Sequence, residues 1–144
     1  MSTSISGAAA LRVAVASNND GILDGHFGSC DRFLVYQVSA DAHHLIETRP
    51  AAEADDAADR NLARVALIAD CQVLFVQSIG GPAAAKVVRA GVHPVKIAKG
   101  GPAGETLVRL QESLRYPPPW LARIMGVEAA SLAPFRELVE AVET

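Results

Sequence analysis

The sequence has little cysteine and no long apolar run. Its two cysteines, Cys30 and Cys71, are far apart and form no C-x-x-C pair, so we expect neither a disulfide framework nor a closed zinc site. The longest apolar stretch, 65–76, is interrupted by polar residues, and no basic residue precedes the short apolar patch within 1–10. These absences predict no membrane span and no signal peptide. We therefore expect a protein of the reducing cytoplasm.

Short motifs of common enzyme classes are also absent. The chain contains no G-x-S-x-G, H-E-x-x-H or EF-hand pattern, and neither G-x-G-x-x-G nor a P-loop. Its carboxylates gather in turns and in an acidic connector at 51–59, so no acid–base pair is nominated. A small hydrolase is disfavoured because no inward set of carboxylates suits two-metal chemistry.

Composition predicts one folded domain with an uneven charge distribution. At 144 residues, about two thirds of the unfolded surface can be buried on folding, which suffices for a real core. Residues 71–126 carry seven basic and two acidic side chains, whereas the blocks on either side are acidic. This asymmetry fits an anion-binding surface, but scattered Lys and Arg on the backs of helices give the same count.

Hydrophobic patterning predicts an α/β domain with the element order βββαβαβα. Two β-loop-α-β steps require parallel neighbours, and a hairpin adds antiparallel strands at one edge, so we expect a mixed five-stranded sheet. The apolar face of the first helix is expected to carry Leu62, Val65, Ala66 and Ala69. The expected strands span residues 12–17, 33–39, 43–48, 72–79 and 92–98, and the expected helices span 61–69, 82–90 and 105–115.

Three regions are expected along the chain. Residues 1–10 are predicted to be disordered, 11–116 to form the α/β domain, and 117–144 to form a Pro-rich connector and a C-terminal helical extension. The run Pro117-Pro118-Pro119 ends the preceding helix, and Ser131 is placed to cap a final amphipathic helix. This extension is expected to pack on the domain or on a partner.

The main candidate for chemistry is His26, in the loop Asp24-Gly25-His26-Phe27-Gly28 after the first strand. The flanking glycines, Gly25 and Gly28, permit unusual backbone angles and close approach of a ligand. Imidazole is the commonest protein metal ligand and also carries protons. An ordinary exposed loop histidine would give the same pattern.

Several residues around this loop are secondary candidates. A thiolate at Cys30 would suit iron or an iron–sulfur group, although a free core cysteine is the alternative, and Cys71 is expected to be a core cysteine. The turn Gly80-Gly81 opens a helix, so its N–H groups either receive an anion or merely start that helix. Because the carboxyl ends of parallel strands border one crevice, His26, Gly80-Gly81 and Lys99-Gly100 should share one edge, with Arg32 and Lys99 adding positive charge.

Four segments carry a resemblance to a known family. They are R-V-A-V-A-S-N-N-D-G-I-L-D-G-H-F-G-S-C at 12–30, F-L-V-Y-Q-V at 33–38, I-A-D-C-Q-V-L-F-V at 68–76 and S-I-G-G-P-A-A at 78–84. Over residues 11–125 the chain resembles the nitrogenase iron-molybdenum cofactor-binding family, which includes NifX, NifY and the core domain of NafY. The segment P-P-P-W-L-A-R-I-M-G at 117–126 looks closest to the NifY and NafY branch.

The resemblance implies a ribonuclease-H-like fold and a cytoplasmic carrier or chaperone, not an enzyme. Its cargo would be the iron-molybdenum cofactor or its iron–sulfur precursor, bound reversibly, and its partners apo-dinitrogenase and cofactor-assembly proteins. Carried over residue by residue, the family's cofactor-binding histidine falls on His26. We expect a monomer with no nucleic-acid or membrane partner. The alternative is a cofactor-free module that docks on apo-dinitrogenase through 117–144.

Overall fold

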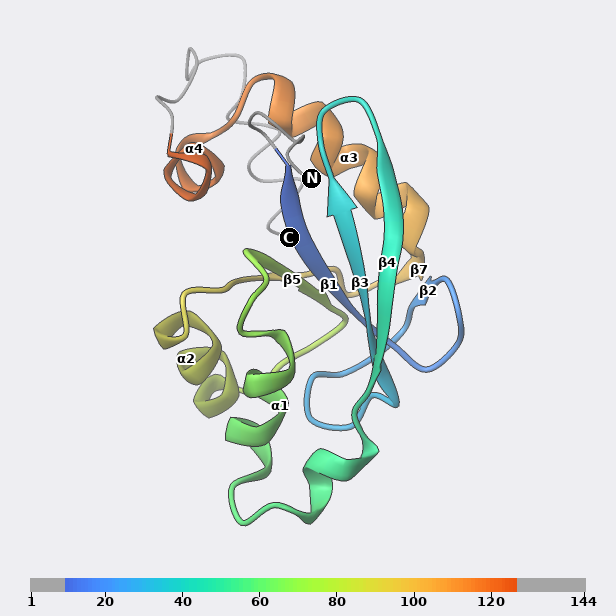
Figure 1. The fold of residues 1–144 in the computed structure, drawn as a ribbon, viewed down its shortest axis with the longest axis vertical. Coiled ribbons are helices and arrows are strands. Elements are labelled where there is room, and N and C mark those ends of the chain that lie inside the picture. Colours follow the sequence, from blue (N-terminus) through green and yellow to red (C-terminus); the bar gives the residue numbers. More distant parts are fainter. Residues whose placement is uncertain (1–9, 127–144) are drawn as a thin grey trace.

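A five-stranded mixed sheet in the order β4-β3-β1-β5-β6 organises the fold (Figure 1). A computed structural model describes residues 10–126. The strands are β1 (Leu11–Ser17), β2 (Ile22–Leu23), β3 (Arg32–Val38), β4 (His43–Pro50), β5 (Val73–Val76), β6 (His93–Lys96) and β7 (Gly101–Pro102). The helical elements are a 3₁₀ helix η2 (Ala52–Asp56), α1 (Arg60–Ile68), α2 (Gly81–Arg89), α3 (Ala103–Arg115) and α4 (Pro119–Met125).

The central strand β1 joins the antiparallel and parallel halves of the sheet. It pairs antiparallel with β3 and parallel with β5; β4 extends the first half and β6 the second. The predicted α/β class and mixed five-stranded sheet are confirmed, and this topology is compatible with a ribonuclease-H-like fold. The short pair β2-β7 and the helix η2 were not predicted.

Each face of the sheet is covered by its own core. Because side chains alternate along a strand, Val13 and Val15 belong to the core beneath α3, whereas Ala14 and Ala16 face the core beneath α1 and α2. The expected face of α1 was wrong in part. Its buried residues are Arg64, Val65 and Ile68, whereas Leu62 is 55% exposed.

Helix α4 completes the core on the α3 side. Trp120 stacks on His93 with 4.4 Å between the ring centroids, and Trp120 and Leu121 join the α3-side core. Within 10–126, no helix is long and apolar enough to cross a membrane. The predicted disordered segment 1–10, except for residue 10, and the predicted helix at Ser131 lie outside the described residues.

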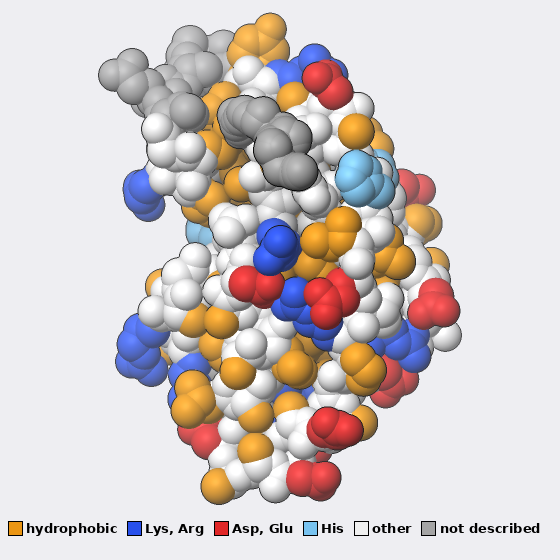
Figure 2. All heavy atoms as spheres, viewed as in Figure 1, with side chains coloured by type: hydrophobic (Ala, Val, Ile, Leu, Met, Phe, Trp, Pro, Cys, Tyr) orange, Lys and Arg blue, Asp and Glu red, His pale blue; other side chains and the backbone are white. Residues whose placement is uncertain are grey.

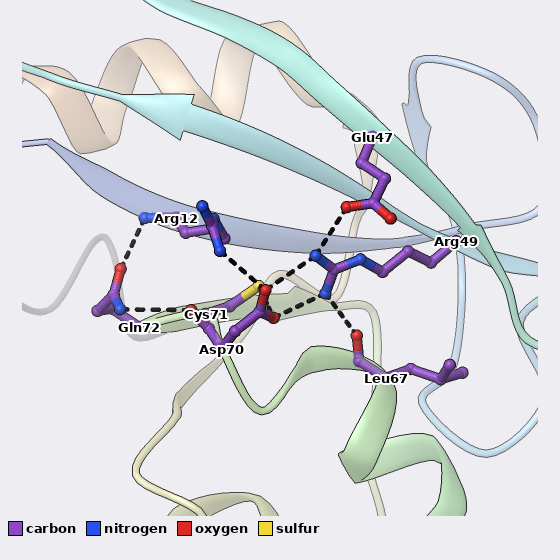
Figure 3. Close-up of polar contacts among 7 residues, drawn as sticks. All are labelled: Arg12, Glu47, Arg49, Leu67, Asp70, Cys71 and Gln72. Atoms are coloured by element: carbon purple, nitrogen blue, oxygen red, sulfur yellow. Dashed lines mark hydrogen bonds and ion pairs between the residues drawn. The ribbon is translucent and has the colours of Figure 1, made fainter. Parts of the chain in front are cut away.

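An ion-pair cluster fastens α1 to the sheet (Figure 3). Asp70 follows α1, and its carboxylate accepts two hydrogen bonds from Arg49, at 2.7 and 2.9 Å, and one from Arg12 at 2.9 Å. Arg49 also donates to the carbonyl of Leu67 at 2.7 Å. Hydrogen bonds from Arg49 hold the pKa of Asp70 well below its usual range. Burial raises the pKa of the neighbouring Cys71 to about 12, so this buried free cysteine remains a thiol.

The Asp70 cluster makes stability depend on pH. Because the folded-state pKa of Asp70 lies below its usual value of 3.8, its contribution is full above that value and is lost as pH falls towards the folded-state pKa. The Asp70 side chain is 43% exposed, so screening limits its contribution to about 1 kcal/mol. Asp70→Asn should lower the free energy of urea unfolding by this amount near neutral pH, and by less below about pH 3.

The exposed Asp56 supplies the control for this prediction, because Asp56→Asn removes a carboxylate that forms no ion pair within the described residues. A loss for Asp70→Asn that stays constant across the acid range would contradict the assignment of the effect to an ionised carboxylate.

Candidate functional site

The loop that connects β2 to β3 brings His26 to the carboxyl ends of β1 and β5. Its backbone is tied to both strands: Gly25 N–H donates to Ala16 O at 3.1 Å, and Gln77 N–H donates to Gly25 O at 2.9 Å. Phe27 N–H donates to Ser78 O at 3.0 Å, and His26 forms an isolated parallel bridge with Ser78. The position of His26 is therefore set by the sheet.

Gly25 allows this close approach. A Cβ atom at Gly25 would lie 2.7 Å from the Cβ of Cys30 and 2.8 Å from the carbonyl carbon of Ala16, so any side chain there would force the surrounding backbone to shift. The need for glycine here is steric, since Gly25 has no positive φ. Gly28 is less confined, because the nearest atom to an added Cβ is an Arg60 nitrogen at 3.7 Å.

A buried arginine holds the far side of the loop. The Arg64 side chain is 1% exposed, and its Nη1 donates to the carbonyls of Phe27 and Cys30, both at 3.0 Å. Its Nη2 donates to Asp55 Oδ1 at 3.0 Å, which compensates the charge. Arg64 thus joins α1 and η2 to the carbonyls on either side of the loop tip.

Asp24 and Asn18 close the base of the loop. Asn18 N–H donates to Asp24 Oδ1 and Asn19 Nδ2 donates to Asp24 Oδ2, both at 2.6 Å. Asn18 Oδ1 in turn accepts from Asp31 N–H at 2.9 Å. The polar residues that predicted a turn therefore also clamp the two ends of the loop together.

The imidazole of His26 is exposed and has one side-chain partner. Its Nδ1 is hydrogen-bonded to the hydroxyl of Ser78, which follows β5. Within residues 10–126, the ring makes no other hydrogen bond. The other ring nitrogen, Nε2, is thus available to an incoming group.

The other predicted site residues are placed unevenly around His26. Gly80 and Gly81 lie two and three residues after Ser78, are exposed, and have open space where a Cβ would stand. Arg32 starts β3 at the same sheet edge, where its guanidinium pairs with Asp20 at 3.2 Å.

Cys30 points into the protein rather than towards His26. Its residue is 1% exposed, and its sulfur lies 3.5 Å from Arg64 Nη1. Burial raises the pKa of its thiol, although Arg64 opposes this shift. A bulky ligand at the surface cannot contact this sulfur in the observed conformation. Cys30 therefore packs in the core beneath the loop and is not part of the exposed site.

The turn at Lys99-Gly100 lies next to the end of β5, as the sequence predicted for the loops around His26. Gln77 Nε2 donates to Ala98 O at 3.1 Å, so the segment before Lys99 lies beside the residue that precedes Ser78. An added Cβ on Gly100 would meet Leu23 O at 2.4 Å, because this turn packs against β2. Lys99 is exposed on the same turn.

Sequence reasoning missed Ser78 and Arg64. A short polar residue close to the carboxyl end of a buried parallel strand is the signal that could have found Ser78. No comparable signal marks Arg64, because helical periodicity assigns a charged residue to the solvent side.

The basic residues of 71–126 are spread over several elements: α2, β6, the turn after β6, α3 and α4. Figure 2 shows basic side chains along the side of α2 and α4, and basic and acidic side chains intermixed over the middle of this face. Lys86 of α2 pairs with Asp59 at 3.5 Å, and Arg89 is exposed on the same helix. Part of the excess of basic residues in 71–126 therefore comes from solvent-facing sides of helices.

These features define a small α/β domain that presents one histidine at the carboxyl edge of its parallel strands. The family model described as dinitrogenase iron-molybdenum cofactor matches residues 9–113. The chain belongs to this family, which confirms the resemblance seen in the sequence.

Known relatives agree with this placement. The chain is 52% identical over 119 residues to protein NifY of Azotobacter vinelandii, covering 82% of this chain and 49% of that protein. It thus spans about half the length of that relative. It is 34% identical over 138 residues to protein NifX of Sinorhizobium fredii, covering 89% of this chain and 86% of that protein.

A solved structure shares the fold. The apo form of the orange protein from Desulfovibrio gigas superposes with a TM-score of 0.61 at 19% identity, covering 72% of this chain and 89% of that one. At this identity the likeness concerns the fold alone.

Replacing Arg64 should loosen the His26 loop. Arg64→Met keeps apolar bulk but leaves the buried carbonyls of Phe27 and Cys30 unpaired, so we expect a loss of about 2–4 kcal/mol in urea unfolding. Arg60→Met is the control, because Arg60 is 53% exposed and lies 3.6 Å from Asp55, and it should cost under about 1 kcal/mol. Equal losses for the two variants would contradict the anchoring role of Arg64.

The steric role of Gly25 is tested by adding one methyl group. Gly25→Ala should cost about 1–3 kcal/mol, because the new Cβ overlaps backbone as well as Cys30. In the control Gly104→Ala, the new Cβ meets nothing within 4 Å, and stability should change by less than about 1 kcal/mol in the favourable direction. Denaturant unfolding measures both; a harmless Gly25→Ala would show that the loop does not need this close approach.

Proposed function

We propose that this chain carries the iron-molybdenum cofactor, or its iron–sulfur precursor, as reversible cargo bound through His26. The observation that carries the proposal is an exposed imidazole on a loop whose backbone is fixed by β1, β5 and Arg64. Membership of the dinitrogenase iron-molybdenum cofactor family supports this identification of the cargo. The carrier would deliver it to apo-dinitrogenase together with cofactor-assembly proteins, and it would not act as an enzyme.

A fixed imidazole suits reversible binding of an iron-containing cluster. Imidazole nitrogen is a good ligand for iron, and a side chain that is already positioned loses little conformational freedom on binding. A single protein ligand also exchanges more easily than a closed cage of four, which a carrier requires for release.

The surroundings of His26 suit a bulky anion. Gly80 and Gly81 leave open space at the start of α2, where the helix dipole and free N–H groups favour negative charge. Arg60, close to Gly28, and Lys99 on the neighbouring turn supply positive charge at the same edge. Gly28, Gly80, Gly81 and Arg32 thus assist the proposed binding, whereas the buried Cys30 does not contact the cargo.

Anaerobic titration with isolated iron-molybdenum cofactor tests the anchor. His26→Ala should weaken binding at least about tenfold without changing the melting temperature, because it removes a ligand from an exposed position. The control is His44→Ala, since His44 is exposed on β4. Co-migration of metal with protein on a native gel gives the readout.

Unchanged affinity in folded His26→Ala would remove the proposed anchor. If neither protein binds the cofactor while both bind apo-dinitrogenase, the chain is a cofactor-free docking module. Binding only of the iron–sulfur precursor would narrow the cargo to that species.

A further inference from the structure

We infer that Ser78 is a positioning residue that holds Nδ1 of His26 and thereby presents Nε2 as the cluster-binding atom. The inference rests on the proposed function and deepens it, because it names the ligating nitrogen and the side chain that selects it. The juxtaposition that carries it is the hydrogen bond between His26 Nδ1 and Ser78 Oγ.

The backbone determines this side-chain pairing. Phe27 N–H donates to Ser78 O at 3.0 Å, and Gln77 N–H donates to Gly25 O at 2.9 Å. These bonds set His26 and Ser78 opposite each other as a parallel bridge. Directly paired residues of neighbouring strands project their side chains to the same face, so the hydroxyl meets the ring in a fixed register.

The hydrogen bond between Ser78 and Nδ1 of His26 bears on which ring nitrogen can bind a metal. Neutral imidazole carries a proton on one nitrogen and a lone pair on the other, and Ser78 Oγ can accept from Nδ1–H or donate to an unprotonated Nδ1. We assign it the accepting role, because Nε2 then keeps the lone pair that a metal needs. When Ser78 Oγ accepts a hydrogen bond from Nδ1–H, the lone pair lies on Nε2. No proton then has to leave the neutral ring when a metal binds, because the proton stays on Nδ1.

Steric reasons also favour Nε2. Nδ1 is the ring nitrogen nearer to the backbone, where the loop is packed against β1 and β5 through Gly25 and Phe27. Nε2 is the distal nitrogen of an exposed ring, so it can contact a bulky cluster without displacing the loop. Outer partners that fix a ligating histidine typically change metal affinity by about 10- to 100-fold.

Two substitutions separate this role from simple packing. Ser78→Ala removes the hydroxyl, whereas Ser78→Thr retains it. Ser29→Ala is the matched control, because Ser29 is exposed in the same loop and only its backbone N–H bonds to His26 O, at 3.1 Å. Melting temperatures of all variants report whether the fold is kept.

The first readout is the tautomer of His26 in the cofactor-free protein, measured by nitrogen-15 NMR. The wild type, Ser78→Thr and Ser29→Ala should show the Nδ1–H tautomer, and Ser78→Ala should lose this preference. A wild-type ring that carries its proton on Nε2 would overturn the inference, as would an unchanged tautomer in Ser78→Ala.

The second readout is the affinity for isolated iron-molybdenum cofactor. Ser78→Ala should bind about 10- to 100-fold more weakly, and Ser78→Thr should restore most of the loss. Wild-type affinity in Ser78→Ala, together with loss in His26→Ala, would overturn the inference and leave the proposed function standing. Absence of uptake by the wild type would overturn both.

Discussion

A guanidinium group buried in a small domain must find partners for its charge and its N–H groups, and Arg64 finds them in the loop that carries His26. It donates to two loop carbonyls and pairs with Asp55, whose carboxylate reaches the solvent. Removing it would leave the carbonyls buried without partners, which costs about 1–3 kcal/mol for each group. The loop therefore keeps its shape only while α1, η2 and the sheet keep theirs. This coupling fixes an exposed imidazole without any direct contact to the ring.

The two ends of the central strands have different tasks. Near the start of β5, Asp70 is held by Arg12, from the start of β1, and by Arg49, whose side chain reaches it from the end of β4; these ion pairs fasten α1 to the sheet (Figure 3). At the carboxyl ends of these strands, glycine and short polar side chains bring three turns close together around His26 and Ser78. The Asp70 ion pairs thus lie away from the edge where the proposed cargo binds, and that edge has exposed groups and open space. Such a division suits a carrier, which must bind and release without unfolding.

Local patterns were sufficient to predict the sheet and the order of its elements. Alternating and continuous apolar runs mark β1, β3 and β5, and Asp59 caps α1 with its side chain on Leu62 N–H at 3.0 Å, near the predicted start of the helix. The pair β2-β7 was missed because strands of two residues have no periodicity.

The details of the site depend on contacts that sequence patterns do not encode. Arg64 points inward because two loop carbonyls and Asp55 accept its hydrogen bonds. The buried face of α1 therefore differs from the face that the spacing of apolar residues predicts. Ser78 meets His26 across 52 residues of sequence, and only the register of the strands brings them together. The importance of His26 was predictable from its loop and from the family resemblance, but its partner was not.

Anomalous diffraction from crystals of the chain loaded anaerobically with isolated iron-molybdenum cofactor tests the central claim most directly, because it locates the metal atoms. The account predicts a metal atom about 2 Å from Nε2 of His26, with Nδ1 still bonded to Ser78. A cluster held away from His26, or bound through Nδ1, would contradict it.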